Sequence, residues 1–294
     1  MGIVLGLATA LCWGSADLFA RYATRRIGTF RTMLYMQGVG WVLLTAVMPL
    51  LGGWGHLVDG SGWRPWAWGI LAGLLNTTST LALYRSFEVG KLSVVAPVSA
   101  SYPALTMLLA VLSGERLTAA RFFGIVLIIV GVVLVARGEV TAAEAQTTSA
   151  GSTDEKRRAG VGWALLSAAG FGVMFWLLGL RIVPALGSAP SVWMIRSTSF
   201  VTTIVVMLIT AKAITPPAIK VSPLLLAVGI LDTSAWVFNN FGMLREQVSV
   251  VSVLASLYGA VTVGLAAIFL RERVSRMQWM GIAAVFLGIS LISR

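Results

Sequence analysis

The sequence predicts an all-α integral membrane protein, a bundle of ten transmembrane helices formed by two inverted five-helix repeats. Three observations predict it: an apolar composition, ten separate apolar stretches and an internal repeat. The chain has 294 residues, of which 57% are hydrophobic and 11% charged, whereas a soluble domain has about 25% charged residues. A soluble protein this apolar could not cover its surface with polar groups, so lipid must be its solvent. The composition therefore excludes cytosolic enzymes, secreted disulfide scaffolds and disordered chains.

Ten mostly apolar stretches approach the length of about 20 residues that a helix needs to cross a bilayer. They are continuous rather than alternating in hydrophobicity, which excludes a porin-type barrel. The predicted spans are Gly2–Ala20, Thr32–Leu51, Pro65–Tyr84, Leu92–Leu112, Ala119–Ala136, Gly160–Leu180, Ser191–Ala211, Pro223–Met243, Val248–Leu270 and Met277–Ser293.

One segment divides these spans into two groups of five. Thr141–Arg158 is small, polar and charged and has no apolar period, which is typical of a loop that joins two units. We therefore expect a first five-helix domain at residues 1–136, a polar linker at 137–159 and a second five-helix domain at 160–294.

The two halves repeat each other. Ser93–Ala96 reads SVVA, and Ser249–Ser252, 156 residues later, reads SVVS. Other pairs keep the same order at offsets of 156 to 158: Tyr102 with Tyr258, Thr106 with Thr262, Gly114–Gly124 with Arg271–Gly281, and Trp13–Gly14 with Phe171–Gly172. Because five crossings is an odd number, the second half must enter from the opposite side. Inverted repeats of this kind occur in secondary transporters, with the substrate site near the midplane.

The basic residues indicate the orientation. Lys and Arg exceed Asp and Glu by 22 to 11, and 15 of the 22 lie on alternate loops. By the positive-inside rule these loops are cytoplasmic and both termini are periplasmic. We expect a multi-pass protein of a bacterial inner (cytoplasmic) membrane. The net charge of +11 is spread over loops and does not indicate nucleic-acid binding.

Two motifs carry a resemblance to a known family. Trp13–Ser15 reads WGS, and the pairs Glu115–Arg116 and Glu272–Arg273 each belong to a box in which Thr or Ser follows two residues after the arginine and a glycine follows later. The chain resembles the EamA-type carriers of the drug/metabolite transporter superfamily, and its aromatic content and length are most similar to the YddG-type aromatic amino acid exporters. The resemblance implies a basket-shaped bundle, metabolite export and alternating access. It departs in one place: Arg196 matches an arginine of the second helix, but Gln37 stands at the equivalent place in the first half.

Polar and aromatic side chains form stripes on the predicted spans. Polar groups facing lipid are costly, so they turn inward by default. Small hydroxyl residues could instead bond back to their own helix, and tryptophans near span ends could belong to the interfacial belt. The candidate substrate-binding residues are Trp13, Asn76, Thr80, Tyr84, Ser99, Tyr102, Trp163, Phe171, Trp176, Asp232, Trp236, Asn239 and Tyr258.

Charged residues inside spans are candidates for coupling or ion pairing. Asp232 lies near the middle of its span, where an unpaired charge costs several kcal/mol. It could hold a substrate ammonium, exchange a proton, or be a structural partner of Arg196 on the preceding helix or of Asn239 or Asn240. Asp17 precedes Arg21 by four residues and could form only a helix-surface pair with it.

Three residues mark candidate hinges in the fourth and ninth spans. Pro97 and Pro103 interrupt the fourth span, and Gly259 occupies the place of Pro103 in the ninth. These positions predict either a bend that moves during transport or a static kink.

Other function classes fit less well. Asp17 and Asp232 are not repeat equivalents, His56 is the single histidine, and the chain contains no GxxxxGK[ST] motif, so we expect no enzyme, no metal and no cofactor. Cys12 is alone and cannot form an intrachain disulfide. The sequence favours a secondary transporter that exports small metabolites, above all aromatic or other apolar amino acids. The alternative is an exporter of cationic lipophilic drugs. Expected partners are the substrate and membrane lipid, with the protein as a monomer.

Overall fold

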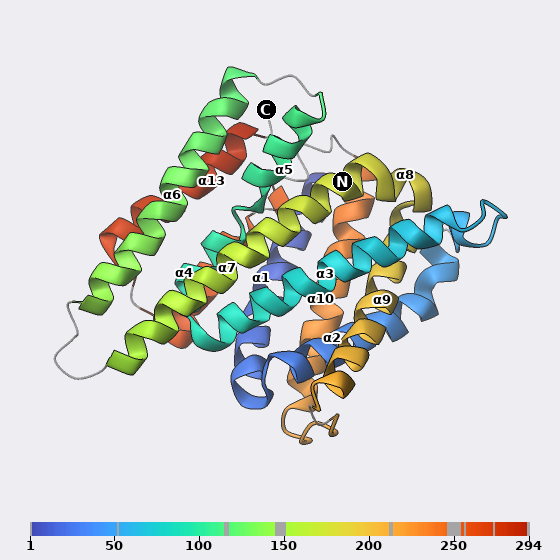
Figure 1. The fold of residues 1–294 in the computed structure, drawn as a ribbon, viewed down its shortest axis with the longest axis horizontal. Coiled ribbons are helices and arrows are strands. Elements are labelled where there is room, and N and C mark those ends of the chain that lie inside the picture. The colour runs from blue at the N-terminus through green and yellow to red at the C-terminus, as the bar shows by residue number, and fades with distance from the viewer. Residues whose placement is uncertain are drawn as a thin grey trace.

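Helices make up all the regular secondary structure of the described residues (Figure 1). The computed structural model describes residues 2–51, 53–114, 118–144, 151–211, 214–245, 254–255, 257–272 and 274–292. The elements are α1 (Gly2–Ile27), α2 (Thr29–Val47), η1 (Met48–Leu51), η2 (Gly55–Leu57), α3 (Arg64–Val89), α4 (Leu92–Ser99), α5 (Tyr102–Leu112), α6 (Ala119–Glu144), α7 (Gly151–Leu177), η3 (Leu178–Ile182), α8 (Val183–Leu186), α9 (Ser188–Ile209), α10 (Ser222–Arg245), α12 (Tyr258–Leu265), η4 (Ala266–Leu270) and α13 (Arg276–Ile292).

The helices have the length and composition of membrane spans. Within the described residues, six segments are long and apolar enough to cross a bilayer, and three shorter apolar helices accompany them. Large apolar side chains point outward from the bundle, for example Ile129 (55% exposed) and Leu287 (61% exposed). Such surface is costly in water and natural in lipid. The six segments are Gly2–Ile27, Thr29–Leu51, Leu92–Leu112, Ala159–Leu186, Ser188–Ile209 and Ser222–Asn239.

Several helices extend beyond their predicted apolar spans. Helix α1 continues seven residues past Ala20 to Ile27, and α3 continues past Tyr84 to Val89. Helix α6 continues to Glu144 and α7 begins at Gly151, so much of the predicted linker is helical. Alanine, glutamate, lysine and arginine are good helix formers. Hydropathy therefore predicted the apolar part of each of these helices but not the polar residues by which the helix extends beyond it.

The fourth predicted span is broken in its middle. Helix α4 ends at Ser99 and α5 begins at Tyr102, with a turn between them. Pro97 lies inside α4, and Pro103 lies in the first turn of α5, where its missing N–H costs no helix hydrogen bond. In the ninth span, α12 passes into the π-helical turn η4. Whether these interruptions move during transport stays a prediction.

Helices α6 and α13 pack closely along a glycine seam. A Cβ added at Gly131 would lie 2.6 Å from the carbonyl oxygen of Gly281, and a Cβ added at Gly288 would lie 2.7 Å from that of Gly124. Only glycine permits such an approach of two backbones. The earlier glycine of α6, Gly124, contacts the later glycine of α13, Gly288, and the later glycine of α6, Gly131, contacts the earlier Gly281. The two helices are therefore antiparallel.

One local arrangement occurs in both halves of the chain. The hydroxyl oxygen of Thr262 lies 3.5 Å from the carbonyl oxygen of Gly14, and the hydroxyl oxygen of Thr106 lies 3.0 Å from the carbonyl oxygen of Gly172. The internal repeat of the sequence pairs Thr106 with Thr262 and Gly14 with Gly172, so the two contacts are equivalent in the two halves. At the level of helices, α1 packs against α10 and α12, and α7 packs in the same way against α3 and α5.

Candidate functional site

A cavity in the bundle brings together residues from helices throughout the chain. Its volume is about 70 Å³, which is well below the range of about 300–1,000 Å³ typical of small-molecule sites. Side chains thus fill most of the space in this conformation. The lining residues are Trp13, Ala16, Asp17, Met36, Asn76, Thr80, Leu83, Tyr84, Tyr102, Phe171, Phe175, Arg196, Asp232, Trp236 and Tyr258.

Aromatic rings form the apolar side of the cavity. Phe175 lies between two rings, stacked on Tyr102 with centroids 4.7 Å apart and on Trp236 at 5.7 Å. Trp13 meets Trp236 edge-on at 5.6 Å and Tyr258 edge-on at 5.9 Å. We call these five rings the aromatic cage. Stacked and edge-on pairs at such separations are favourable arrangements of ring quadrupoles, and a ligand ring could replace one of them.

Arg196 and Asp232 form an ion pair at the polar side of the cavity. The guanidinium is buried at 1% exposure, and its Nη1 also donates to Oε1 of Gln37 at 2.8 Å. A Cβ added at Gly40 would lie 3.1 Å from Nε of Arg196, so this glycine leaves room for the guanidinium. This ion pair is the contact that the structural interpretation of Asp232 expects.

Asp17 is the second carboxylate of the cavity and has a different environment. It is 7% exposed and accepts a hydrogen bond from the hydroxyl of Thr262 at 3.0 Å. The expected pair with Arg21 does not form, because Arg21 reaches toward Glu272 at 3.5 Å. Within the described part of the chain, no cation pairs with Asp17.

The polar stripe expected on the third span faces the cavity from α3. Asn76, Thr80 and Tyr84 all line it and are all buried. The amide of Asn76 donates to the hydroxyl of Ser199 at 3.1 Å, which fixes the position of that side chain against α9. Spacing of four residues places the three on one face of the helix.

Four candidate residues do not line this cavity. Trp163 is exposed at 40% on the outer face of α7, and the indole N–H of Trp176 donates to the hydroxyl of Ser113 at 3.0 Å. Ser99 and Asn239 are buried in α4 and α10, outside the lining set. Of the two Glu–Arg pairs, Glu115, Arg116 and Arg273 lie outside the described residues.

Sequence reasoning missed Phe175, the central ring of the aromatic cage, along with Met36, Ala16 and Leu83. A signal for Phe175 was present, since it follows Phe171 by four residues and therefore shares its helix face. No group of three or more His, Cys, Asp or Glu side chains comes together in the described residues.

Comparison with known proteins identifies the family. The model of the EamA-like transporter family matches residues 1–137 and 158–294. The chain belongs to the EamA-like transporter family. Members of this family are membrane transporters of small molecules, not enzymes, and the apolar helices of this EamA-like chain agree with a multi-pass membrane protein. The match does not single out the YddG-type exporters within the family.

Two individual comparisons add to the family match. An uncharacterized protein of Methanocaldococcus jannaschii is 31% identical over 130 residues, which cover 44% of this EamA-like chain and 91% of the archaeal protein. A crystal structure of a protein superposes with a TM-score of 0.67 at 17% identity, covering 99% of this chain and 95% of the other. At that identity the likeness shows the fold alone.

Proposed function

We propose that this EamA-like protein is a secondary carrier that exports small zwitterionic metabolites, above all aromatic or other apolar amino acids, by alternating access. The observation that carries the proposal is the aromatic cage beside Asp17, a buried carboxylate that has no cation partner in the described residues. The cage suits a ring, and a desolvated carboxylate suits an ammonium group.

The charges of the cavity favour a zwitterion or a monocation over an anion. Two carboxylates, Asp17 and Asp232, line it together with one guanidinium, that of Arg196. Because Asp232 is already paired with Arg196, we assign the substrate ammonium to Asp17. Nε of Arg196 and Nε2 of Gln37 are buried without an acceptor in the described residues, so this region has donor capacity for a carboxylate.

The architecture that we propose for transport is the ten-helix inverted repeat with domains at residues 1–136 and 160–294. Its support is the antiparallel packing of α6 and α13, the paired contacts of Thr106 and Thr262, and a family match in each half. Equivalent helices that point in opposite directions can exchange roles, which opens the site to one side at a time. The cytoplasmic basic loops, the bacterial inner membrane and the monomer remain part of this proposal.

Substrate entry requires the cavity to expand, because about 70 Å³ holds only a few waters. The interruption of the fourth span at Ala100–Ser101, between Pro97 and Pro103, is the place where we expect α5 to swing relative to α4. Gly259 faces this interruption, since a Cβ added there would lie 3.1 Å from Cβ of Ala100.

A transport assay tests the proposal. Purified protein is reconstituted into proteoliposomes, and these are loaded with radiolabelled phenylalanine or tryptophan. Efflux of the amino acid is then measured with and without a proton gradient. Asp17→Asn should lower efflux about tenfold or more, as loss of a buried charge partner does. The lipid-facing Trp163→Phe should transport normally. Absence of phenylalanine and tryptophan efflux by the unmodified protein would refute the assignment.

The alternative, export of cationic lipophilic drugs, also uses Asp17 and the aromatic cage. A cationic drug differs from an amino acid in having no carboxylate, so its binding does not require a hydrogen-bond donor such as Arg196. Tetraphenylphosphonium efflux that survives Arg196→Lys, together with no amino acid efflux, would favour this alternative. Loss of amino acid efflux in Arg196→Lys with normal folding would favour the amino acid assignment, because lysine keeps the charge and loses the fork.

A further inference from the structure

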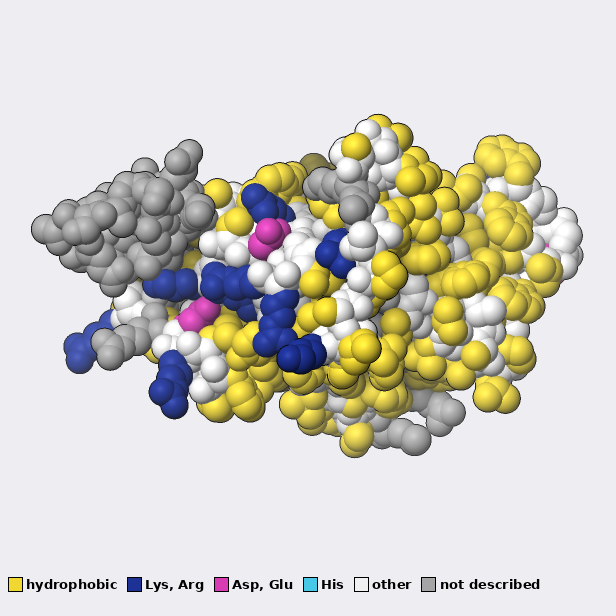
Figure 2. All heavy atoms as spheres, turned by 90° about the horizontal axis from the view of Figure 1, so that it is seen from below, with side chains coloured by type: hydrophobic (Ala, Val, Ile, Leu, Met, Phe, Trp, Pro, Cys, Tyr) yellow, Lys and Arg dark blue, Asp and Glu magenta, His cyan; other side chains and the backbone are white. Residues whose placement is uncertain are grey.

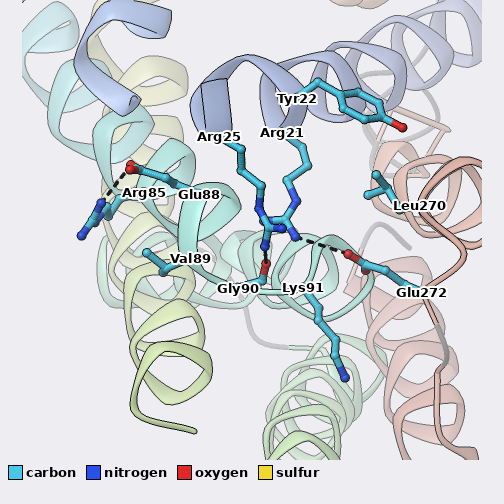
Figure 3. Close-up of a pocket in the computed structure, with 10 residues that line it drawn as sticks. All are labelled: Arg21, Tyr22, Arg25, Arg85, Glu88, Val89, Gly90, Lys91, Leu270 and Glu272. Carbon is cyan, nitrogen blue, oxygen red and sulfur yellow. Dashed lines mark hydrogen bonds and ion pairs between the residues drawn. The ribbon is translucent and has the colours of Figure 1, made fainter. Parts of the chain in front are cut away.

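A second cavity, of about 770 Å³, lies where the C-terminal ends of α1 and α3 meet the connection between η4 and α13 (Figure 3). It is about the size of a small-molecule site and is separate from the aromatic cage. On the face seen in Figure 2, Lys and Arg side chains gather with acidic ones between them and apolar surface beyond. The charged residues that line the cavity are Arg21, Arg25, Arg85, Lys91, Glu88 and Glu272.

Positive charge is in excess in this second cavity. Each carboxylate already has a cation: Glu88 pairs with Arg85 at 2.9 Å, and Glu272 pairs with Arg21 at 3.5 Å. Four basic side chains against two acidic ones leave a net charge of +2 on the lining. An anionic ligand would therefore be attracted to it.

Two of the arginines face the cavity from neighbouring turns of α1. Arg21 and Arg25 point side by side toward Gly90 (Figure 3), and Nη2 of Arg25 donates to the carbonyl of Gly90 at 3.3 Å. Arg21 is 4% exposed. Like charges four residues apart on a helix repel, and each guanidinium has five N–H donors. A ligand with several acceptor oxygens would relieve this repulsion and use the remaining donors.

We propose that this second cavity binds a phosphate group. Phosphate oxygens match the fork of a guanidinium, and an ammonium such as that of Lys91 adds a point charge. The group could come from the headgroup of an anionic phospholipid or from a soluble phosphate. Basic pockets between membrane helices on the cytoplasmic side are places where lipid phosphates bind, and the size of the cavity admits either source. The proposal is independent of the exported substrate.

The test uses purified, delipidated protein and two probes, phosphatidylglycerol and inorganic phosphate. The protein is incubated with vesicles of phosphatidylcholine that contain phosphatidylglycerol, and native mass spectrometry measures how much phosphatidylglycerol it retains. Vesicles of phosphatidylcholine alone are the negative control. Isothermal titration calorimetry measures binding of inorganic phosphate. Arg25→Gln and Lys91→Gln should each weaken binding about fivefold, the effect of one basic residue near an anionic surface. Arg26→Gln is the matched control, since Arg26 is exposed on α1 and does not line the cavity.

The outcomes separate the two sources. Retention of phosphatidylglycerol without binding of inorganic phosphate, reduced by Arg25→Gln, supports a lipid headgroup. Binding of inorganic phosphate with the same sensitivity supports a soluble phosphate. If neither probe binds the unmodified protein, or if Arg26→Gln weakens binding as much as Arg25→Gln, the site does not exist as proposed. Thermal unfolding of each variant shows whether it is folded.

Discussion

The carboxylate of Glu272 accepts hydrogen bonds from the backbone N–H of Ser93 at 2.8 Å and from its hydroxyl at 2.7 Å. The same carboxylate accepts from the N–H of Leu92 at 3.2 Å and pairs with Arg21. It thus satisfies free N–H groups at the start of α4, where negative charge is favourable. Ser93 begins the SVVA segment and Glu272 belongs to a Glu–Arg pair. Two motifs that recur in both halves of the sequence are therefore in direct contact.

Replacing Glu272 by glutamine should destabilise the protein. The change would leave Arg21, whose side chain is 4% exposed, without its anion, and breaking a buried pair in this way costs about 3 kcal/mol. Thermal unfolding of the purified protein in detergent measures the effect. Glu88→Gln is the control, because its pair with Arg85 is 45% exposed on the arginine side and should contribute less than about 1 kcal/mol. Equal losses in the two variants would contradict the assigned role.

Gly131→Ala should separate α6 from α13. The added Cβ would lie 2.6 Å from the carbonyl oxygen of Gly281, and backbone cannot yield as a flexible side chain can. We expect a loss of about 1–3 kcal/mol, as for other overpacked sites, again measured by thermal unfolding. Gly162→Ala is the matched control in α7, since nothing lies within 4 Å of its Cβ position. The control should be neutral or slightly stabilising, and a loss as large as that of Gly131→Ala would argue against the tight seam.

The sequence predicted the polar side of the cavity better than the apolar side. Asn76, Thr80 and Tyr84 could be found because a polar group facing lipid is costly and its position is therefore informative. Phe175 could be placed only by its spacing of four residues from Phe171, since a phenylalanine is about equally stable toward lipid or toward the interior. Trp176 follows it by one residue and so points to another side of the helix.

The partner of Asp232 and the ends of the helices could not be obtained from sequence. The structural interpretation of Asp232 depends on its distance from Arg196, and that distance depends on how α9 and α10 pack. Hydropathy located the lipid-facing part of α6 but carried no information on its continuation to Glu144. The equivalence of Thr106 and Thr262, in contrast, could be predicted from the matched order of residues in the two halves, and both make the same kind of contact with a glycine carbonyl.

Asp232→Asn should lower stability more than Asp17→Asn. Removing the Asp232 charge leaves the guanidinium of Arg196, at 1% exposure, without its counter-ion, at a cost of about 3–5 kcal/mol. The double variant Asp232→Asn, Arg196→Gln should recover part of this loss, with a coupling of about 0.5–3 kcal/mol. Unfolding measurements on the four members of the cycle give the coupling. Additive losses would mean that the two residues act independently.

Phe175→Ala should weaken transport of aromatic substrates while leaving apolar aliphatic ones less affected. The ring is stacked on both Tyr102 and Trp236, and each such ring pair contributes about 0.5–1.5 kcal/mol beyond its buried area. A substrate ring that stacks on Phe175 would lose one such pair, which predicts a rise in KM for phenylalanine of about two- to tenfold, with a smaller rise for leucine. Competition between the two amino acids in proteoliposome efflux measures both values on one preparation. Trp176→Phe, one residue along the same helix and outside the lining set, is the control and should leave the ratio unchanged. An equal rise for phenylalanine and leucine would show that Phe175 shapes the cavity without recognising a ring.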